Sequence, residues 1–116
     1  MCGWVKYKIE YLRNWKHYVN LLAKSIKELL PNTQAYVIGG AAEDRLTILS
    51  DIDVLIVIDK PLTDSQRRKL KTDILWNAIE KYGLPWDYPV EIHIATKEEL
   101  KTYLRHTKKI IPIKIK

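Results

Sequence analysis

The chain has 116 residues, of which 47% are hydrophobic and 29% are charged, proportions that exclude a disordered chain. Lys and Arg together number 20 and Asp and Glu number 14, which gives a net charge of +6. The length suits a single domain over residues 1–116 and excludes a multi-domain enzyme. No apolar run approaches the ~20 residues that a transmembrane helix needs, so we expect no membrane span.

The N-terminus and the cysteine content bear on location. Residues 1–8 mix Trp with Lys and have no apolar stretch of the kind found in signal peptides. The single cysteine, Cys2, excludes an internal disulfide, and both observations predict a cytoplasmic protein. The chain is rich in Lys and Ile and has no Phe, one Met and one Cys, a composition typical of thermophile proteins.

The first half of the chain is expected to hold one helix and two strands. Apolar residues recur every three or four positions over residues 4–30, which predicts one long amphipathic helix that ends at a proline. Residues 35–38 form a short predicted strand, and residues 41–50 are expected to be a loop or a short helical turn. Residues 52–58 are almost all β-branched or Leu, as in a strand covered on both faces.

The second half has two helix starts of the capping-box type. The first, at residues 63–66, opens a helix that should end at Gly83 in a left-handed conformation. A strand over residues 90–95 follows, and a second capping box at residues 96–99 opens another helix. The basic tail, residues 107–116, alternates Ile and Lys around a proline and is expected to be an edge strand or an ordered arm.

This order of elements predicts an α/β (α+β) domain, in which a small sheet is flanked by helices. Basic residues gather at both ends of the chain, whereas residues 34–96 contain more acids than bases. An acidic centre between basic ends fits a metal site in a protein that meets phosphate-rich or acidic partners.

Two aspartates open the most apolar strand. Asp51 and Asp53 are two positions apart, so an extended chain points both side chains to the same side. Carboxylates this close repel each other unless a cation lies between them. Hard oxygen ligands suit Mg²⁺, which usually takes one or two carboxylates together with substrate phosphates and water. The alternative is an ordinary turn and cap before a strand.

Glu91 offers a third carboxylate on a later strand. If that strand pairs beside the aspartate strand, Glu91 joins the two aspartates, and three carboxylates can hold two Mg²⁺ ions for displacement at phosphorus. A solvated outward position is the alternative for Glu91. His93 shares its face and is either a contact for substrate or metal or a half-exposed strand residue.

A glycine pair, Gly39-Gly40, ends the strand that precedes the aspartates. Glycine lets backbone amides approach a phosphate closely, and successive amides in such a turn form an anion-binding nest. Ser50 adds a hydroxyl donor beside the aspartates. These residues together predict a phosphate cradle next to a metal-holding acid cluster on adjacent strands.

In this order, Gly39-Gly40, Ser50 to Asp53 and Glu91 resemble the motifs of the minimal members of the polymerase beta-like nucleotidyltransferase superfamily. The match spans residues 36–95, which we take as the core of the domain. The resemblance implies a small mixed sheet flanked by helices, preceded here by the long N-terminal helix. It also implies an enzyme that transfers a nucleoside monophosphate from a nucleoside triphosphate, ATP being expected, to a hydroxyl on a protein or RNA.

The resemblance assigns roles to individual residues. Asp51 and Asp53 would hold two Mg²⁺ ions, and Glu91 would bind the catalytic ion and help to deprotonate the attacking hydroxyl. The triphosphate would be held by the glycine turn and the loop that follows it, namely Gly39, Gly40, Ser50 and Arg45.

Family members that pair with helical toxins of the HEPN type act as antitoxins, some by adenylylating the toxin. The resemblance therefore implies a HEPN-type protein partner, and a homo-oligomer is a second option. Glu43-Asp44 stand where many minimal members have Arg-Gly, and Gly40 stands where many have Ser. These departures favour, as an alternative function, a catalytically inactive antitoxin-like binding module.

Two basic segments leave further alternatives open. The predicted N-terminal helix interleaves aromatic and basic residues, a mixture that either contacts nucleic acid or fills the core with its aromatic rings. A small nucleic-acid-binding protein is thus another alternative function. The basic run that starts at Arg67 is expected to be a solvated helix face.

Overall fold

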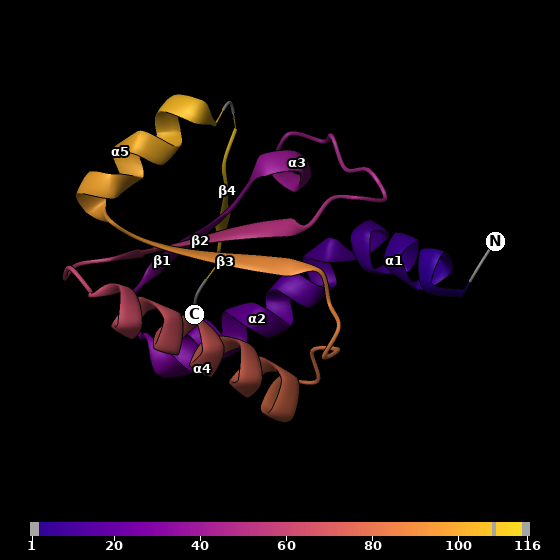
Figure 1. The fold of residues 1–116 in the computed structure, drawn as a ribbon, viewed down its shortest axis with the longest axis horizontal. Helices are drawn as coiled ribbons and strands as arrows, with labels where there is room; N and C mark the ends of the chain where they lie inside the picture. Colours follow the sequence, from indigo (N-terminus) through magenta and orange to yellow (C-terminus); the bar gives the residue numbers. More distant parts are fainter. Residues whose placement is uncertain (1–2, 108, 115–116) are drawn as a thin grey trace.

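A four-stranded sheet with helices on both faces forms the centre of the protein (Figure 1). The computed structural model describes residues 3–107 and 109–114. Its elements are, in chain order, α1 (Gly3–Arg13), α2 (Trp15–Leu29), β1 (Gln34–Ile38), α3 (Gly39–Ala42), β2 (Ile52–Ile58), α4 (Asp64–Tyr82), β3 (Val90–Thr96), α5 (Lys97–His106) and β4 (Ile111–Ile113). This architecture confirms the predicted α+β domain with a small sheet flanked by helices.

The sheet is mixed, with the strand order β3-β2-β1-β4. Strand β1 runs antiparallel to β2 and to β4, whereas β2 and β3 are parallel. The parallel pair places the starts of β2 and β3 side by side, with Asp53 opposite Glu91. Because β1 runs the other way, its last residue, Ile38, pairs with Asp53. The glycine turn after β1 therefore lies at the same end of the sheet as the acidic residues.

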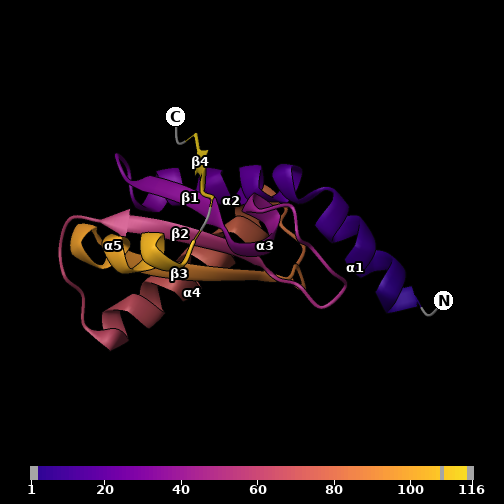
Figure 2. The ribbon, with the colours of Figure 1, turned by 90° about the horizontal axis from the view of Figure 1, so that it is seen from above.

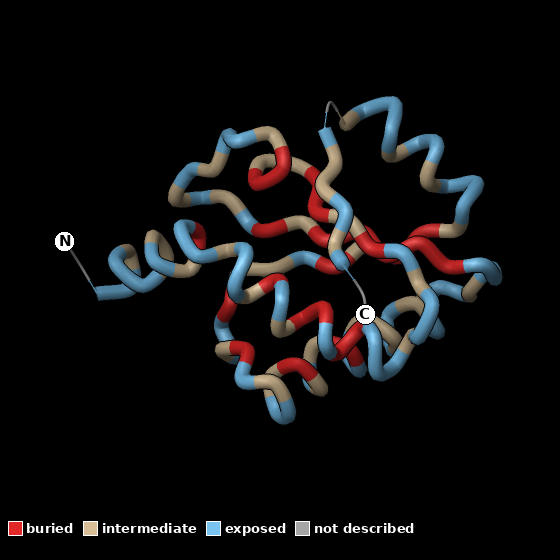
Figure 3. The backbone as a smooth tube through the Cα atoms, turned by 180° about the vertical axis from the view of Figure 1, so that it is seen from behind, coloured by how far each residue is buried: buried red, intermediate tan, exposed pale blue. Residues whose placement is uncertain are grey.

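The two faces of the sheet are covered by different helices (Figure 1). One set of alternate strand residues, such as Val54 and Ile92, belongs to the main core with residues of α2 and α4. The other set, which includes Leu55 and Val57, forms a smaller cluster with Tyr103 of α5. Figure 3 shows that buried residues concentrate in the strands and in the helices beneath them, while α1 and α5 remain largely exposed.

The N-terminal helix is divided in two at Asn14, so the prediction of one continuous helix was wrong. Asn14 has φ −100° and ψ 28°, and its carbonyl accepts from the backbone amide of His17. Asparagine is a weak helix former, and the break lets α2 pack on the sheet while α1 extends past its end (Figure 2). Tyr11 fixes α1 there, because its hydroxyl donates to Asp87 at 2.9 Å and its carbonyl accepts from the Tyr88 hydroxyl at 3.1 Å.

Both predicted capping boxes are confirmed. In the first, the Gln66 amide donates to the Thr63 hydroxyl, and the Gln66 side chain accepts from the Thr63 amide. Thr96 and Glu99 make the same pair of bonds at the start of α5. The predicted left-handed end of α4 is also present, with φ 78° at Gly83.

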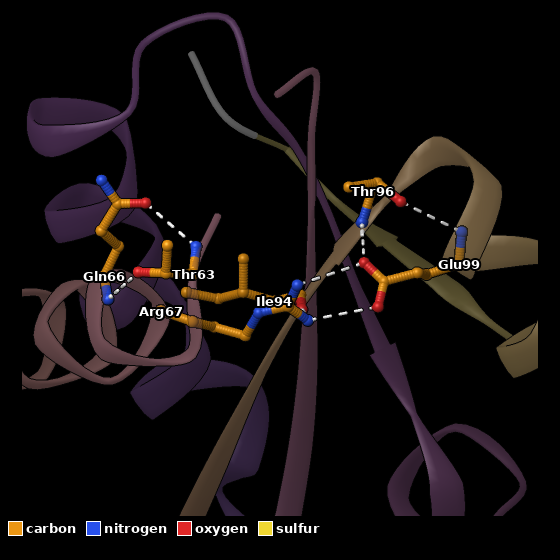
Figure 4. A network of polar contacts seen from close by, with 6 residues as sticks. All are labelled: Thr63, Gln66, Arg67, Ile94, Thr96 and Glu99. Atoms are coloured by element: carbon orange, nitrogen blue, oxygen red, sulfur yellow. Dashed lines mark hydrogen bonds and ion pairs between the residues drawn. The ribbon is translucent and has the colours of Figure 1, made fainter. Parts of the chain in front are cut away.

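Arg67 joins the starts of the two capped helices (Figure 4). Its guanidinium donates to the carbonyl of Ile94 in β3 at 2.7 Å and to both carboxylate oxygens of Glu99. Its side chain is 23% exposed, so the expectation of a solvated position was wrong for this residue. Arg67 thus connects α4, β3 and α5 at the end of the sheet opposite to Asp53.

The tail forms an edge strand, as one of the two predicted options. Ile111 and Ile113 lie opposite Val37 and Ala35 of β1, and both partly buried side chains pack against the main core. Residues 1, 2, 108, 115 and 116 lie outside the described part of the chain. The predictions for Cys2 and for the ends of the tail concern these positions. Within the described residues, no helix combines the length and apolar character needed to cross a membrane.

Candidate metal and nucleotide site

Three side chains that suit a divalent cation converge at the start of the parallel strand pair. Asp53, Glu91 and His93 each offer one ligand atom, and these atoms all lie within 4.8 Å of one another. His93 Nε2 lies 3.2 Å from Asp53 Oδ1. The convergence follows from the register, because Asp53 faces Glu91 directly and His93 is the next residue of β3 on the same face.

Two of the three side chains are partly buried, and the third is exposed to solvent. The side chains of His93 and Asp53 are 23% and 28% exposed, whereas Glu91, near the start of β3, is exposed. The ring of Tyr103 in α5 meets the His93 imidazole edge-on, with 5.9 Å between the ring centroids. The imidazole is therefore held against an apolar wall on one side while the open side of the group faces solvent.

Gly39 is required by the position of Asp53. Its φ of +69° belongs to the left-handed region, and a β-carbon there would lie 2.6 Å from Asp53 Oδ2. The backbone of the glycine turn therefore rests directly against a carboxylate of the candidate site. Gly40 differs, because a β-carbon would meet its nearest neighbours, the Arg45 carbonyl and the Leu46 side chain, at an ordinary 3.6 Å.

Asp51, two residues before Asp53, is not part of the converging group, and its carboxylate pairs with a lysine instead. It is exposed, and its Oδ1 lies 3.7 Å from Nζ of Lys8, whose side chain is 22% exposed. Lys8 comes from α1, which runs alongside the loop between α3 and β2 in both ribbon views (Figures 1 and 2). Sequence reasoning missed Lys8 because nothing in the pattern of residues 3–13 gives the angle between α1 and α2 at the break at Asn14.

The other two residues expected at the phosphates are bonded within their own loop. The Ser50 hydroxyl accepts from the Thr47 amide at 2.8 Å. The Arg45 guanidinium pairs with Glu43, at 3.0 Å from Nη2 to Oε1. Both side chains therefore have loop partners in this structure, in contrast to Gly39, which contacts Asp53.

The donor set fits a divalent cation. Two carboxylates and one imidazole supply negative charge and a borderline nitrogen ligand from two rigid, adjacent strands. The glycine turn beside Asp53 presents backbone rather than side chains to this end of the sheet. Three donor side chains from two strands are therefore placed to bind one divalent cation.

Comparisons with known proteins agree with this geometry. The model of the nucleotidyltransferase domain family matches residues 19–114. One solved structure, of a proposed nucleotidyltransferase, is 30% identical with a TM-score of 0.51, and the alignment covers 78% of this chain and 90% of that one. A second, of a proposed nucleotidyltransferase from Sulfolobus solfataricus, has the same fold at 17% identity, with a TM-score of 0.65 and coverage of 90% of this chain and 84% of that one.

Among curated proteins, none matches the chain. The family match covers β1 to β4 and includes the glycine turn and all three residues of the candidate metal group. The superfamily resemblance predicted from the motifs is thus confirmed, and the chain belongs to the nucleotidyltransferase domain family.

Proposed function

We propose that the protein transfers a nucleoside monophosphate from a nucleoside triphosphate to an acceptor hydroxyl on a protein or RNA, in a reaction that depends on Mg²⁺. The observation that carries the proposal is the meeting of Asp53 and Glu91 from neighbouring strands beside the backbone of Gly39. Membership of the nucleotidyltransferase domain family supports the same reaction class.

Asp53 and Glu91 are the residues that would hold the metal, with Asp51 as the third carboxylate once it leaves Lys8. When bound, two Mg²⁺ ions would neutralise the negative charge that develops on the phosphate oxygens. Asp53 is fixed by strand pairing on both sides, opposite Ile38 and Glu91, so its carboxylate is preorganised for this task.

The transfer itself exchanges one phosphorus–oxygen bond for another. The acceptor oxygen forms a bond to the α-phosphorus, the bond from that phosphorus to the bridging oxygen of the β-phosphate breaks, and pyrophosphate leaves. Glu91 is exposed and can take the proton of the attacking hydroxyl on its carboxylate. The chain's contribution is therefore orientation and proton removal rather than a covalent intermediate.

The triphosphate, ATP in our proposal, would lie along the Gly39-Gly40 turn. For Ser50 and Arg45 to contact it, Ser50 must exchange its bond with Thr47, and Arg45 must exchange its ion pair with Glu43. Lys8 already lies at this end of the sheet and adds a cation near the proposed phosphate position.

We propose further that a protein partner of the HEPN helical type supplies or presents the acceptor. Exposed aromatic side chains support a protein interface near the site, since Trp4 and Tyr7 lie on α1 and Trp86 lies on the loop that α1 contacts through Asp87. Pull-down of a HEPN-type protein by the wild-type chain, and its loss on Trp86→Ala, would support this interface.

The test of the proposed function uses nucleoside triphosphates labelled at the α-phosphate, with Mg²⁺ and a HEPN-type protein as acceptor. We expect label on the acceptor with wild type and at least a hundredfold less with Asp53→Asn. Asp59→Asn is the matched control, because Asp59 follows the opposite end of the same strand and pairs with exposed Lys97. Equal labelling by Asp53→Asn and wild type would contradict the proposal.

The second candidate is an inactive antitoxin-like binding module. The ion pair between Arg45 and Glu43 favours this module. Arg45 is the basic residue of the loop over residues 41–50, and its pairing with Glu43 keeps its positive charge from a triphosphate. Calorimetry with ATP and Mg²⁺ distinguishes the two. Absence of nucleotide binding together with a tight HEPN-type complex would support the module, and nucleotide binding would support the enzyme.

A further inference from the structure

We propose that His93 is a direct metal ligand, and that the candidate site therefore selects a first-row transition-metal dication, with Mn²⁺ bound in preference to Mg²⁺. The proposal rests on the proposed function only for the location of the metal, because it concerns binding to the free protein. It assigns a role to the one residue of the converging group that is not a carboxylate.

The separation between His93 and Asp53 fits two ligands of one ion. At bond lengths of about 2.1 Å, two ligands lie about 3.0 Å apart at an octahedral right angle and about 3.4 Å apart at a tetrahedral angle. His93 Nε2 and Asp53 Oδ1 are 3.2 Å apart, between these values. The third ligand atom, from Glu91, lies within 4.8 Å of the other two.

The imidazole is also held in place by its surroundings. The strand register sets His93 opposite Leu55, which is fully buried, and Tyr103 of α5 lies edge-on to the ring. Because the ring is only 23% exposed on this apolar wall, little rotamer freedom remains to be lost when a metal binds. A preorganised nitrogen in the first coordination sphere is what distinguishes this site from one built of carboxylates alone.

Nitrogen ligation decides between the two classes of cation. Mg²⁺ prefers oxygen ligands and gains little from imidazole, whereas transition-metal dications bind imidazole well. Two carboxylates favour Mn²⁺ as well as Mg²⁺, so adding one imidazole shifts the balance toward Mn²⁺. The same reasoning predicts that Co²⁺ and Zn²⁺ bind more tightly than Mn²⁺.

The experiment measures Mn²⁺ binding to the free protein by electron paramagnetic resonance, without nucleotide. We expect wild type to bind Mn²⁺ at least tenfold more tightly than Mg²⁺, and pulsed spectra to show coupling to an imidazole ¹⁴N. His93→Gln should lose the nitrogen coupling and about tenfold in Mn²⁺ affinity, while its Mg²⁺ affinity changes by less than about twofold. His17→Gln, an exposed histidine on α2, is the matched control and should behave as wild type.

Three results would overturn the proposal. The first is Mn²⁺ binding without nitrogen coupling, which is expected if His93 only forms a hydrogen bond with Asp53. The second is an equal loss of Mg²⁺ and Mn²⁺ affinity in His93→Gln. The third is the absence of Mn²⁺ binding to wild type. The outcome is separable from that of the proposed function. Nitrogen-coupled Mn²⁺ without nucleotide transfer refutes only the enzyme, whereas Mg²⁺-dependent transfer without nitrogen coupling refutes only this ligand assignment.

Discussion

Gly39 and Asp53 form one structural unit, because the backbone of the glycine lies where a side chain would collide with the aspartate carboxylate. A β-carbon at position 39 would come within 2.6 Å of Asp53 Oδ2. The strand pairing of Ile38 with Asp53 fixes this relationship. The glycine turn and the carboxylate of the candidate metal site are thus positioned by the same pair of strands.

Replacing Gly39 by alanine should therefore do more than strain the backbone. The left-handed conformation alone costs an alanine about 1–2 kcal/mol. Gly83→Ala is the matched control, since Gly83 has φ +78° and open space around its missing β-carbon. In urea unfolding, we expect Gly39→Ala to lose more stability than Gly83→Ala, and only Gly39→Ala should weaken Mn²⁺ binding. Equal losses in the two variants would show that Asp53 yields to the extra carbon without cost.

Lys8 places a positive charge beside Asp51, so its removal should change cation and anion binding in opposite directions. We expect Lys8→Met to bind Mn²⁺ about twofold to fivefold more tightly and ATP more weakly by a similar factor, in line with a partly exposed ion pair. Lys6→Met, on the same helix and exposed, is the control. Titration calorimetry at low and high salt measures both effects, which should shrink as salt screens the charge. A change of the same sign for both ligands would refute the electrostatic role.

Glu99 makes the start of α5 sensitive to acid. The Thr96 backbone amide, and then the Arg67 guanidinium, lower the pKa of Glu99 from its ordinary value of 4.5. In acid, the unfolded chain therefore binds more protons at this group than the folded chain does. Its contribution to stability is complete above pH 4.5 and is lost as the pH falls through the folded-state pKa.

Glu99→Gln should accordingly destabilise the protein at pH 7 by less than about 1 kcal/mol, because the ion pair with Arg67 is partly exposed. The difference from wild type should narrow as the pH falls below 4.5. Urea unfolding at a series of pH values measures it, with Glu98→Gln in the same helical turn as the control. A gap between Glu99→Gln and wild type that widens in acid would contradict the expected direction of the pH dependence.

The starts of α4 and α5 and the end of α4 could be predicted from the sequence, because each depends on residues within one helical turn. Thr63 with Gln66, and Thr96 with Glu99, satisfy backbone amides within one helical turn, so their spacing alone is enough to place a helix start. Gly83 ends α4 for an equally local reason. The proximity of Asp53 and Glu91 could also be predicted, once the two apolar strands were taken to be neighbours.

Relationships between distant segments could not be predicted in the same way. The break at Asn14 separates α1 from α2, and the apolar stripe continues through it, so the pattern gives one helix. The pairing of Lys8 with Asp51 depends on the angle between α1 and α2 at that break. The place of His93 beside Asp53 follows from the same register of β2 and β3 that brings Glu91 to Asp53, and the sequence left a substrate or metal contact as one of two options for His93.

The contact of Arg67 with Ile94 also bears on how copies of the chain meet. Strand β3 is an edge strand of the sheet. The Pro89 carbonyl accepts from the Ile52 amide, so odd-numbered residues of β3 direct their backbone groups toward β2. The backbone groups of even-numbered β3 residues therefore point away from the sheet. The Ile94 carbonyl is one of these outward groups, and it accepts a hydrogen bond from the Arg67 guanidinium. A strand from another copy that paired with β3 would have to displace the charged, partly buried Arg67 side chain. Arg67 therefore protects this edge of the sheet against aggregation by strand addition.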